Sequence, residues 1–87
     1  MIDYSITINT EHSQRTYEFR YDHIKYEWIV FINKTQSQYT IKMYQDNDMT
    51  YYDLCRHTEP IKMFEFDFGG LGYISNSIEI ILFIMKD

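Results

Sequence analysis

Cysteine, proline and alanine are almost missing from this sequence of 87 residues. Cys55 is the single cysteine, so the chain cannot close an intramolecular disulfide, and a reducing compartment is expected. The longest apolar run, Ile80 to Met85, is far shorter than the roughly 20 residues that cross a bilayer. The sequence also starts without an apolar leader, and these absences together predict a cytoplasmic protein without a membrane segment.

Helix-forming residues are scarce as well. Alanine does not occur and leucine occurs three times, whereas the chain contains thirteen isoleucines, nine tyrosines and six phenylalanines. Because β-branched and aromatic side chains fit the surface of a sheet, this composition favours strands. An AT-rich coding sequence would produce the same skew, so the order of apolar and polar residues is the stronger evidence.

Apolar and polar residues alternate through the first half of the chain, which is the pattern of half-buried strands. Short polar breaks separate four such segments, and these predict an antiparallel meander. Ile29 and Phe31 make the end of the third segment apolar on both faces, so this part is expected to be buried on both sides or to form an interface. The four predicted strands are residues 2–9, 16–21, 24–32 and 39–44.

The alternation stops between residues 45 and 59. Asp48 can cap the N-terminus of a helix, and apolar residues then recur every three to four positions. This spacing predicts a short helix over residues 48–57. The helix must end before Pro60, because proline lacks the donor N–H and disfavours helical geometry in the residue before it.

Two further strands are predicted after this helix. Residues 61–68 place three phenylalanines on one face, and Gly69-Gly70-Leu71-Gly72 ends the strand. Residues 78–85 are apolar on both faces apart from Glu79, and their four isoleucines favour a central strand or half of a strand-paired dimer over a buried helix. The sequence therefore predicts a mainly β, α+β fold in a single domain over residues 1–87. Its expected architecture is an antiparallel meander sheet of about six strands with one short helix inserted between strands four and five.

The motifs that could carry catalysis are all incomplete. Asp53-x-Cys55-x-His57 combines three types of zinc ligand, but structural zinc needs four, and residues two apart on a helix do not share a face for a Cys-His nucleophile. Asp67-Phe68-Gly69 matches the magnesium-binding tripeptide of kinases in a chain too short for a kinase. No lysine follows the glycines, as it would in a phosphate-binding loop. We therefore expect no enzyme, no metal and no cofactor.

Aromatic side chains on a sheet can stack on nucleobases. The electrostatics oppose this function, because the chain has 8 basic and 13 acidic residues and a net charge of -5. Residues 1–43 hold five acids and five bases, whereas residues 44–87 hold eight acids and three bases and carry the whole negative charge. Direct nucleic-acid binding is therefore not expected, and the second half of the chain is the candidate for contact with a basic partner.

If the predicted helix lies over the fifth strand, carboxylates and tyrosines form one acidic surface. Tyrosine supplies a large contact area, and opposite potentials speed encounter and select partners. An acidic solubilising face without a partner is the alternative. The residues predicted for this surface are Asp46, Asp48, Asp53, Glu59, Glu65, Asp67, Tyr44, Tyr51 and Tyr52.

In size, charge and composition the chain resembles small phage anti-defence proteins, including anti-CRISPRs, and immunity proteins that neutralise nuclease toxins. The resemblance implies a cytoplasmic inhibitor that blocks a nucleic-acid-handling enzyme of a bacterial defence system by presenting carboxylates to its basic channel. Two alternatives remain open, an immunity protein against a nuclease toxin and a homo-oligomeric structural module. The residues predicted for a homodimer interface are Ile29, Phe31, Ile81 and Phe83.

Overall fold

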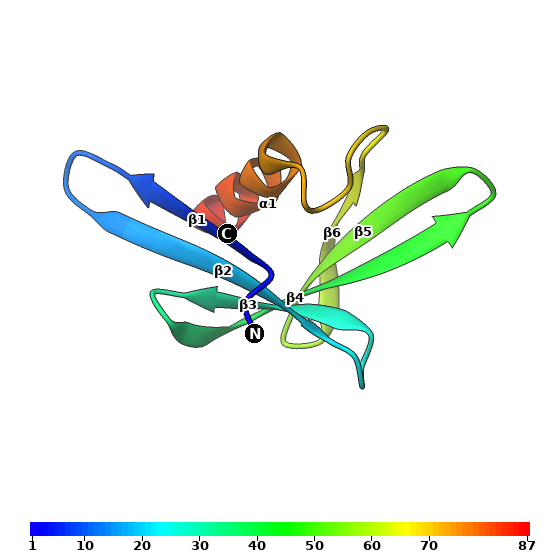
Figure 1. Ribbon diagram of the computed structural model, residues 1–87, viewed down its shortest axis with the longest axis horizontal. Helices are drawn as coiled ribbons and strands as arrows, with labels where there is room; N and C mark the ends of the chain where they lie inside the picture. Colours follow the sequence, from blue (N-terminus) through cyan, green and yellow to red (C-terminus); the bar gives the residue numbers. More distant parts are fainter.

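The computed structural model covers residues 1–87 and contains one six-stranded antiparallel sheet followed by a helix (Figure 1). Neighbouring strands in the sequence are neighbours in the sheet, so the predicted meander of a mainly β fold is confirmed. The elements are β1 (Tyr4–Asn9), β2 (Gln14–Asp22), β3 (Glu27–Ile32), β4 (Thr35–Asp46), β5 (Met49–Arg56), β6 (Glu59–Glu65) and α1 (Ile74–Lys86). At 13 residues, α1 is too short to cross a membrane.

The sheet is coiled, so that the β1–β2 and β4–β5 hairpins spread apart and α1 lies between them (Figure 1). We call the side of the sheet that faces α1 the inner face and the opposite side the outer face. Phe19, Val30, Ile41 and Leu54, from four successive strands, belong to the inner face and are fully buried. The alternation of the sequence therefore becomes a sheet with one face buried by the helix.

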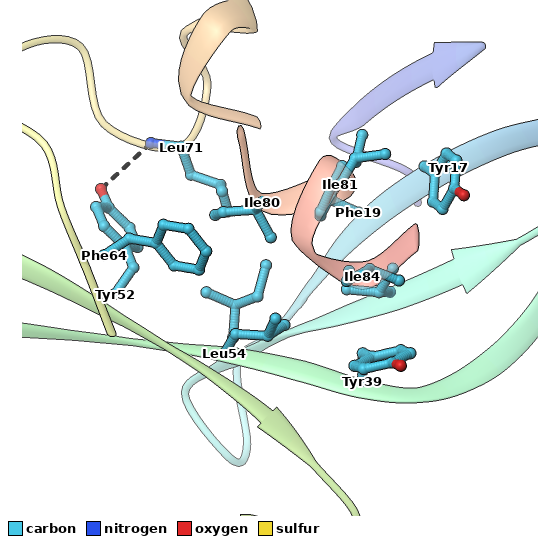
Figure 2. Packing of buried hydrophobic residues seen from close by; sticks show 12 residues of the cluster. Tyr17, Phe19, Tyr39, Tyr52, Leu54, Phe64, Leu71, Ile80, Ile81 and Ile84 are labelled. Carbon is cyan, nitrogen blue, oxygen red and sulfur yellow. Dashed lines mark hydrogen bonds between the residues drawn. The ribbon is translucent and has the colours of Figure 1, made fainter. Parts of the chain in front are cut away.

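Three isoleucines of α1 complete the core. Ile80, Ile81 and Ile84 lie on the side of the helix that faces the sheet, and Figure 2 shows Ile80 above Leu54, Ile81 beside Phe19 and Ile84 above Tyr39. Burying one side chain of this size contributes roughly 2 kcal/mol to folding. The helix therefore supplies a large part of the apolar surface that holds the sheet in its coiled shape.

The C-terminal end of α1 is fixed to the sheet by polar contacts. The Tyr39 hydroxyl donates to Asp87 Oδ2 at 2.7 Å, and the Arg56 guanidinium pairs with the same oxygen. The Tyr39 hydrogen bond first, and then the contact with Arg56, lower the pKa of the Asp87 carboxyl from its ordinary value of 3.8. The charged carboxylate is thus the form that holds the helix end against β4 and β5.

The helix predicted over residues 48–57 is wrong, because this segment is β5. Asn47 adopts the left-handed conformation (φ 54°), which asparagine tolerates, and the resulting tight turn pairs Asp46 with Met49. From this turn the register continues without a break to Tyr39 and Arg56. Long-range pairing with β4 therefore overrides the helical spacing of the apolar residues.

The strand predicted over residues 78–85 is also wrong, because these residues form most of α1. An apolar run can be read as a strand buried on both faces or as a helix with one side in a core, and the coiled sheet offers only the second arrangement. Ile80, Ile81 and Ile84 are buried, whereas Leu82 and Met85 of the same helix are exposed. The helix thus follows the sixth strand and is not inserted between the fourth and fifth.

The fifth predicted strand corresponds to β6, with shifted ends. Pro60 lies inside β6 opposite Cys55, where the pairing with β5 is irregular. Proline is tolerated here because β6 is an edge strand and needs no donor on its free side. The strand ends at Glu65, and Phe68 is 73% exposed rather than in line with the buried Phe64.

Candidate partner-binding face and aromatic pocket

The register of β4, β5 and β6 brings part of the predicted acidic surface together on the outer face. Tyr44 is paired with Tyr51, and Tyr51 is paired with Glu65. Directly paired residues have Cβ atoms about 5 Å apart, so these three side chains form a row across three strands. We call this row, together with Asp46 and Asp53 on the same side of their strands, the outer acidic face.

Side chains of the outer acidic face are accessible to different degrees. Tyr44 is 48% exposed, Asp46 and Glu65 are exposed, and Tyr51 and Asp53 are half-buried. Lys42 is paired with Asp53, and such opposite-charge pairs contribute roughly 0.2–1 kcal/mol and reduce the local charge. The negative potential of this face is therefore carried mainly by Asp46 and Glu65.

Four of the residues predicted for the acidic surface lie elsewhere. Asp48 is in the β4–β5 turn, and Glu59 is at the far end of β6, paired with Arg56. Asp67 follows β6, and Tyr52 belongs to the inner face, where it is 5% exposed. The predicted surface depended on a helix lying over a strand, and strand pairing instead gathers a smaller set.

The residues predicted for a homodimer interface do not share one surface. Ile29 is 7% exposed on the outer face, where it is paired with Thr40, which in turn is paired with the buried Cys55. The Arg20 guanidinium lies over the ring of Phe31, with its central carbon 5.1 Å from the ring centre. Strand pairing between two copies through residues 78–85 is not available, because these residues are helical.

The other two residues of that prediction belong to α1. Ile81 is fully buried in the core of the chain itself. Phe83 is half-buried and packs edge-on against Phe64, with ring centres 6.1 Å apart. While α1 remains on the sheet, Ile81 is therefore not accessible to a second copy, and Phe83 is accessible only in part.

The Asp53-x-Cys55-x-His57 motif is divided between a strand and a turn. Asp53 and Cys55 lie on the outer face of β5, whereas His57 lies in the β5–β6 turn with φ 51°. Burial raises the pKa of the Cys55 thiol, so the thiolate needed by a metal or an electrophile is disfavoured. The structure arranges no group of three His, Cys, Asp or Glu side chains around a metal position.

A pocket of about 470 Å³ opens on the inner face, beside the N-terminal end of β1. Trp28, the only tryptophan, contributes to the lining, with the ring centre of Tyr4 at 5.3 Å and that of Tyr21 at 5.0 Å from its own. Asp3 and Tyr52 also contribute to the lining. Four strands, β1, β2, β3 and β5, thus place aromatic rings around a common space, and the segment before β1 adds one carboxylate. We call this space the aromatic pocket.

The glycine-rich segment Gly69-Gly70-Leu71-Gly72 closes one side of the aromatic pocket. Gly70 has φ +58°, and a Cβ atom there would lie 2.7 Å from the hydroxyl of Tyr52. The Leu71 N–H donates to that hydroxyl at 3.3 Å, as Figure 2 shows. Glycine is required because the backbone must pass directly over the edge of a tyrosine ring.

Two side chains from the start of α1 fix this loop from the other side. Asn76 Nδ2 donates to the carbonyl oxygens of Phe68 and Gly70 at 2.7 and 2.8 Å, and the Ser77 hydroxyl donates to the carbonyl of Leu71. The loop is therefore held between the helix and the sheet, and the wall that it provides is preorganised.

The glycines were predicted to join two strands, and no pattern in the sequence indicated the aromatic pocket. Its residues come from segments between positions 3 and 72, and only folding brings them together. The available signals were the glycine-rich run and the single tryptophan among tyrosines. Comparison of the chain with protein-family models, with curated proteins and with solved structures found no match.

Proposed function

We propose that this chain is a protein-binding inhibitor without catalytic activity, which presents the outer acidic face to a basic partner. The observation that supports this proposal is the row of Tyr44, Tyr51 and Glu65 across β4, β5 and β6. Tyrosine rings provide contact area with few rotatable bonds, and the carboxylates attract and orient a basic surface. Because the row lies on paired strands, its geometry is already formed before binding.

The partner that fits this chemistry is a nucleic-acid-handling enzyme with a basic channel. Lysine and arginine residues that neutralise phosphates would pair equally with carboxylates, so the bound inhibitor competes with the nucleic acid. This is the mode of action proposed for the chain against an effector of a bacterial defence system. Neutralisation of a nuclease toxin uses the same chemistry, and the identity of the captured enzyme separates the two proposals.

The test compares two doubly substituted chains with the same change in net charge. Asp46→Lys with Glu65→Lys reverses the outer acidic face, whereas Glu11→Lys with Glu79→Lys reverses two exposed carboxylates elsewhere. Tagged proteins are used to capture partners from a bacterial lysate at low and high salt, and the enzyme that wild type retains is then assayed for nucleic-acid binding.

We expect wild type and the control to retain one basic enzyme at low salt and to block its binding to nucleic acid, and the reversed face to do neither. An equal loss of capture in both substituted chains would show that capture depends on net charge and not on the outer acidic face. A captured enzyme that still binds nucleic acid would rule out inhibition by competition. Circular dichroism of each variant establishes that the fold is intact.

A homo-oligomeric module is the second candidate, and a different surface favours it. Ile74, Leu82 and Met85 of α1 are 66%, 47% and 39% exposed, and Ile78 is half-buried. Leu82→Glu should then convert a dimer into a monomer in light scattering without unfolding the chain. A monomeric wild type would exclude this candidate.

A further inference from the structure

We propose that the aromatic pocket binds the guanidinium group of an arginine side chain that a protein partner carries. This site lies on the inner face and shares no residue with the outer acidic face. The inference therefore does not depend on the inhibitor proposal, and either can fail alone.

The walls of the pocket suit a flat cation. Tyr4 and Tyr21 both pack against Trp28, with ring centres 5.3 and 5.0 Å away, so the three rings form one continuous aromatic wall of the pocket. The face of an aromatic ring carries partial negative charge and attracts a cation, most strongly when the ring is that of tryptophan. A guanidinium group also stacks on such rings through its own planar face, which an ammonium group cannot do.

Asp3 supplies the charge that selects a cation. Its Oδ2 atom accepts the backbone N–H of Tyr21 at 2.9 Å, which fixes the carboxylate at the rim of the pocket. The other oxygen has no partner within the chain, and it can accept from the fork of a guanidinium. No lysine or arginine lines the pocket; His23 does, with its ring edge-on to Tyr21 at 4.8 Å between ring centres, so the lining offers a phosphate or a nucleotide no permanent positive charge.

The openness of the pocket favours a side chain over a free small molecule. Sites for free ligands usually enclose most of the ligand surface, whereas this pocket is open to solvent on one side. An arginine on a protein gains the rest of its affinity from the surface around it. The preorganised glycine loop then limits the cost of ordering the site on binding.

The experiment titrates the ¹⁵N-labelled chain with acetyl-Gly-Arg-Gly-amide and with the peptide in which citrulline replaces arginine. Citrulline keeps the shape and loses the charge. We expect the arginine peptide to shift the indole N–H resonance of Trp28 and the amide of Gly70, and to bind about tenfold more tightly than the citrulline peptide.

Two variants with the same loss of charge test the role of Asp3. Asp3→Asn retains an acceptor for the Tyr21 N–H and should weaken binding of the arginine peptide about fivefold. Glu11→Gln removes an exposed carboxylate in the β1–β2 turn and should leave the affinity unchanged.

Four results would overturn the assignment. Equal affinity for the two peptides would make the pocket an apolar site, and shifts confined to the outer acidic face would place the binding elsewhere. Tighter binding of choline than of the arginine peptide would assign the pocket to a free cation. No shift at millimolar peptide would leave no arginine site at all.

Discussion

The two faces of the sheet are built from the same strands but differ in burial and in charge. Along β5, Tyr52 and Leu54 point to the inner face and are buried under α1, whereas Tyr51 and Asp53 point outward and are half-buried. Alternation assigns successive residues to opposite faces, so stability and surface charge are separated at a spacing of one residue. Substitutions at the buried residues of the inner face should therefore change the free energy of unfolding, and those in the outer acidic face should change the proposed binding to a basic partner.

The largest expected effect is on the inner face. Leu54 is fully buried, with Ile80 and Ile41 in the same cluster. Leu54→Ala removes buried apolar surface and leaves a cavity, which should lower the free energy of unfolding by roughly 2–5 kcal/mol. Urea denaturation followed by circular dichroism measures this change. A loss below about 1 kcal/mol would show that α1 does not pack tightly on this face.

Removal of the Tyr17 hydroxyl, also on the inner face, should raise the free energy of unfolding instead of lowering it. Its side chain is fully buried, and its hydroxyl has no hydrogen-bond partner. Because an unsatisfied buried polar group costs about 1–3 kcal/mol, Tyr17→Phe should raise the free energy of unfolding by roughly 1 kcal/mol. Lower stability in the same urea experiment would mean that the hydroxyl is hydrated or bonded in solution.

The contact of Asp87, at the C-terminal end of α1, with Tyr39 and Arg56 should depend on pH. The pKa of Asp87 is lowered in the folded state by Tyr39 and then by Arg56, so its stabilising contribution is complete above the ordinary value of 3.8. The contribution is lost as the pH falls from that value through the folded-state pKa. Urea midpoints measured at pH 7 and near pH 3 should therefore fall less for Asp87→Asn than for wild type.

Asp22 provides a comparison for that pH dependence. Its pKa is also lowered, first by the backbone N–H of Ile24 and then by that of Lys25, and it is the last residue of β2, far along the chain from α1. The same sign applies, so Asp22→Asn should also reduce the loss of stability in acid. Identical pH profiles for wild type and both variants would show that neither contact persists in solution.

The smallest effect on stability is expected on the outer face. Glu65→Gln changes an exposed side chain of an edge strand, and the free energy of unfolding should stay within about 0.5 kcal/mol of wild type. Binding to a basic partner should nevertheless weaken, and it should become less sensitive to salt. A large loss of stability without any change in binding would reverse the roles assigned to the two faces.

Much of the sheet was predictable because its signal is local. In β1 the side chains of Tyr4, Ile6 and Ile8 alternate with exposed residues as the sequence indicates. The segment at residues 48–57 was not predictable in this way, because a three- to four-residue spacing of apolar side chains competes with pairing to β4. The turn at Asn47 decides between them, since it brings the two strands together before a short helix could be stabilised.

The two candidate sites also differ in how far the sequence predicts them. The excess of acids in the second half of the chain indicated an acidic surface that includes Asp53, although only the register with Tyr44 and Glu65 shows which residues are adjacent. The aromatic pocket could not be found from the sequence, because no local pattern connects Asp3 with Trp28 or either of them with the glycine loop.

The sequence by itself determined a mainly β chain with an uneven charge distribution and the approximate positions of five of the six strands, because alternation and composition act between near neighbours. Only the tertiary structure decided that residues 74–86 are helical and that the acidic residues are divided between separate surfaces. The physical reason is that an apolar run satisfies either a strand or a helix until a particular surface buries it. Here the coiled inner face of the sheet has room for one side of a helix.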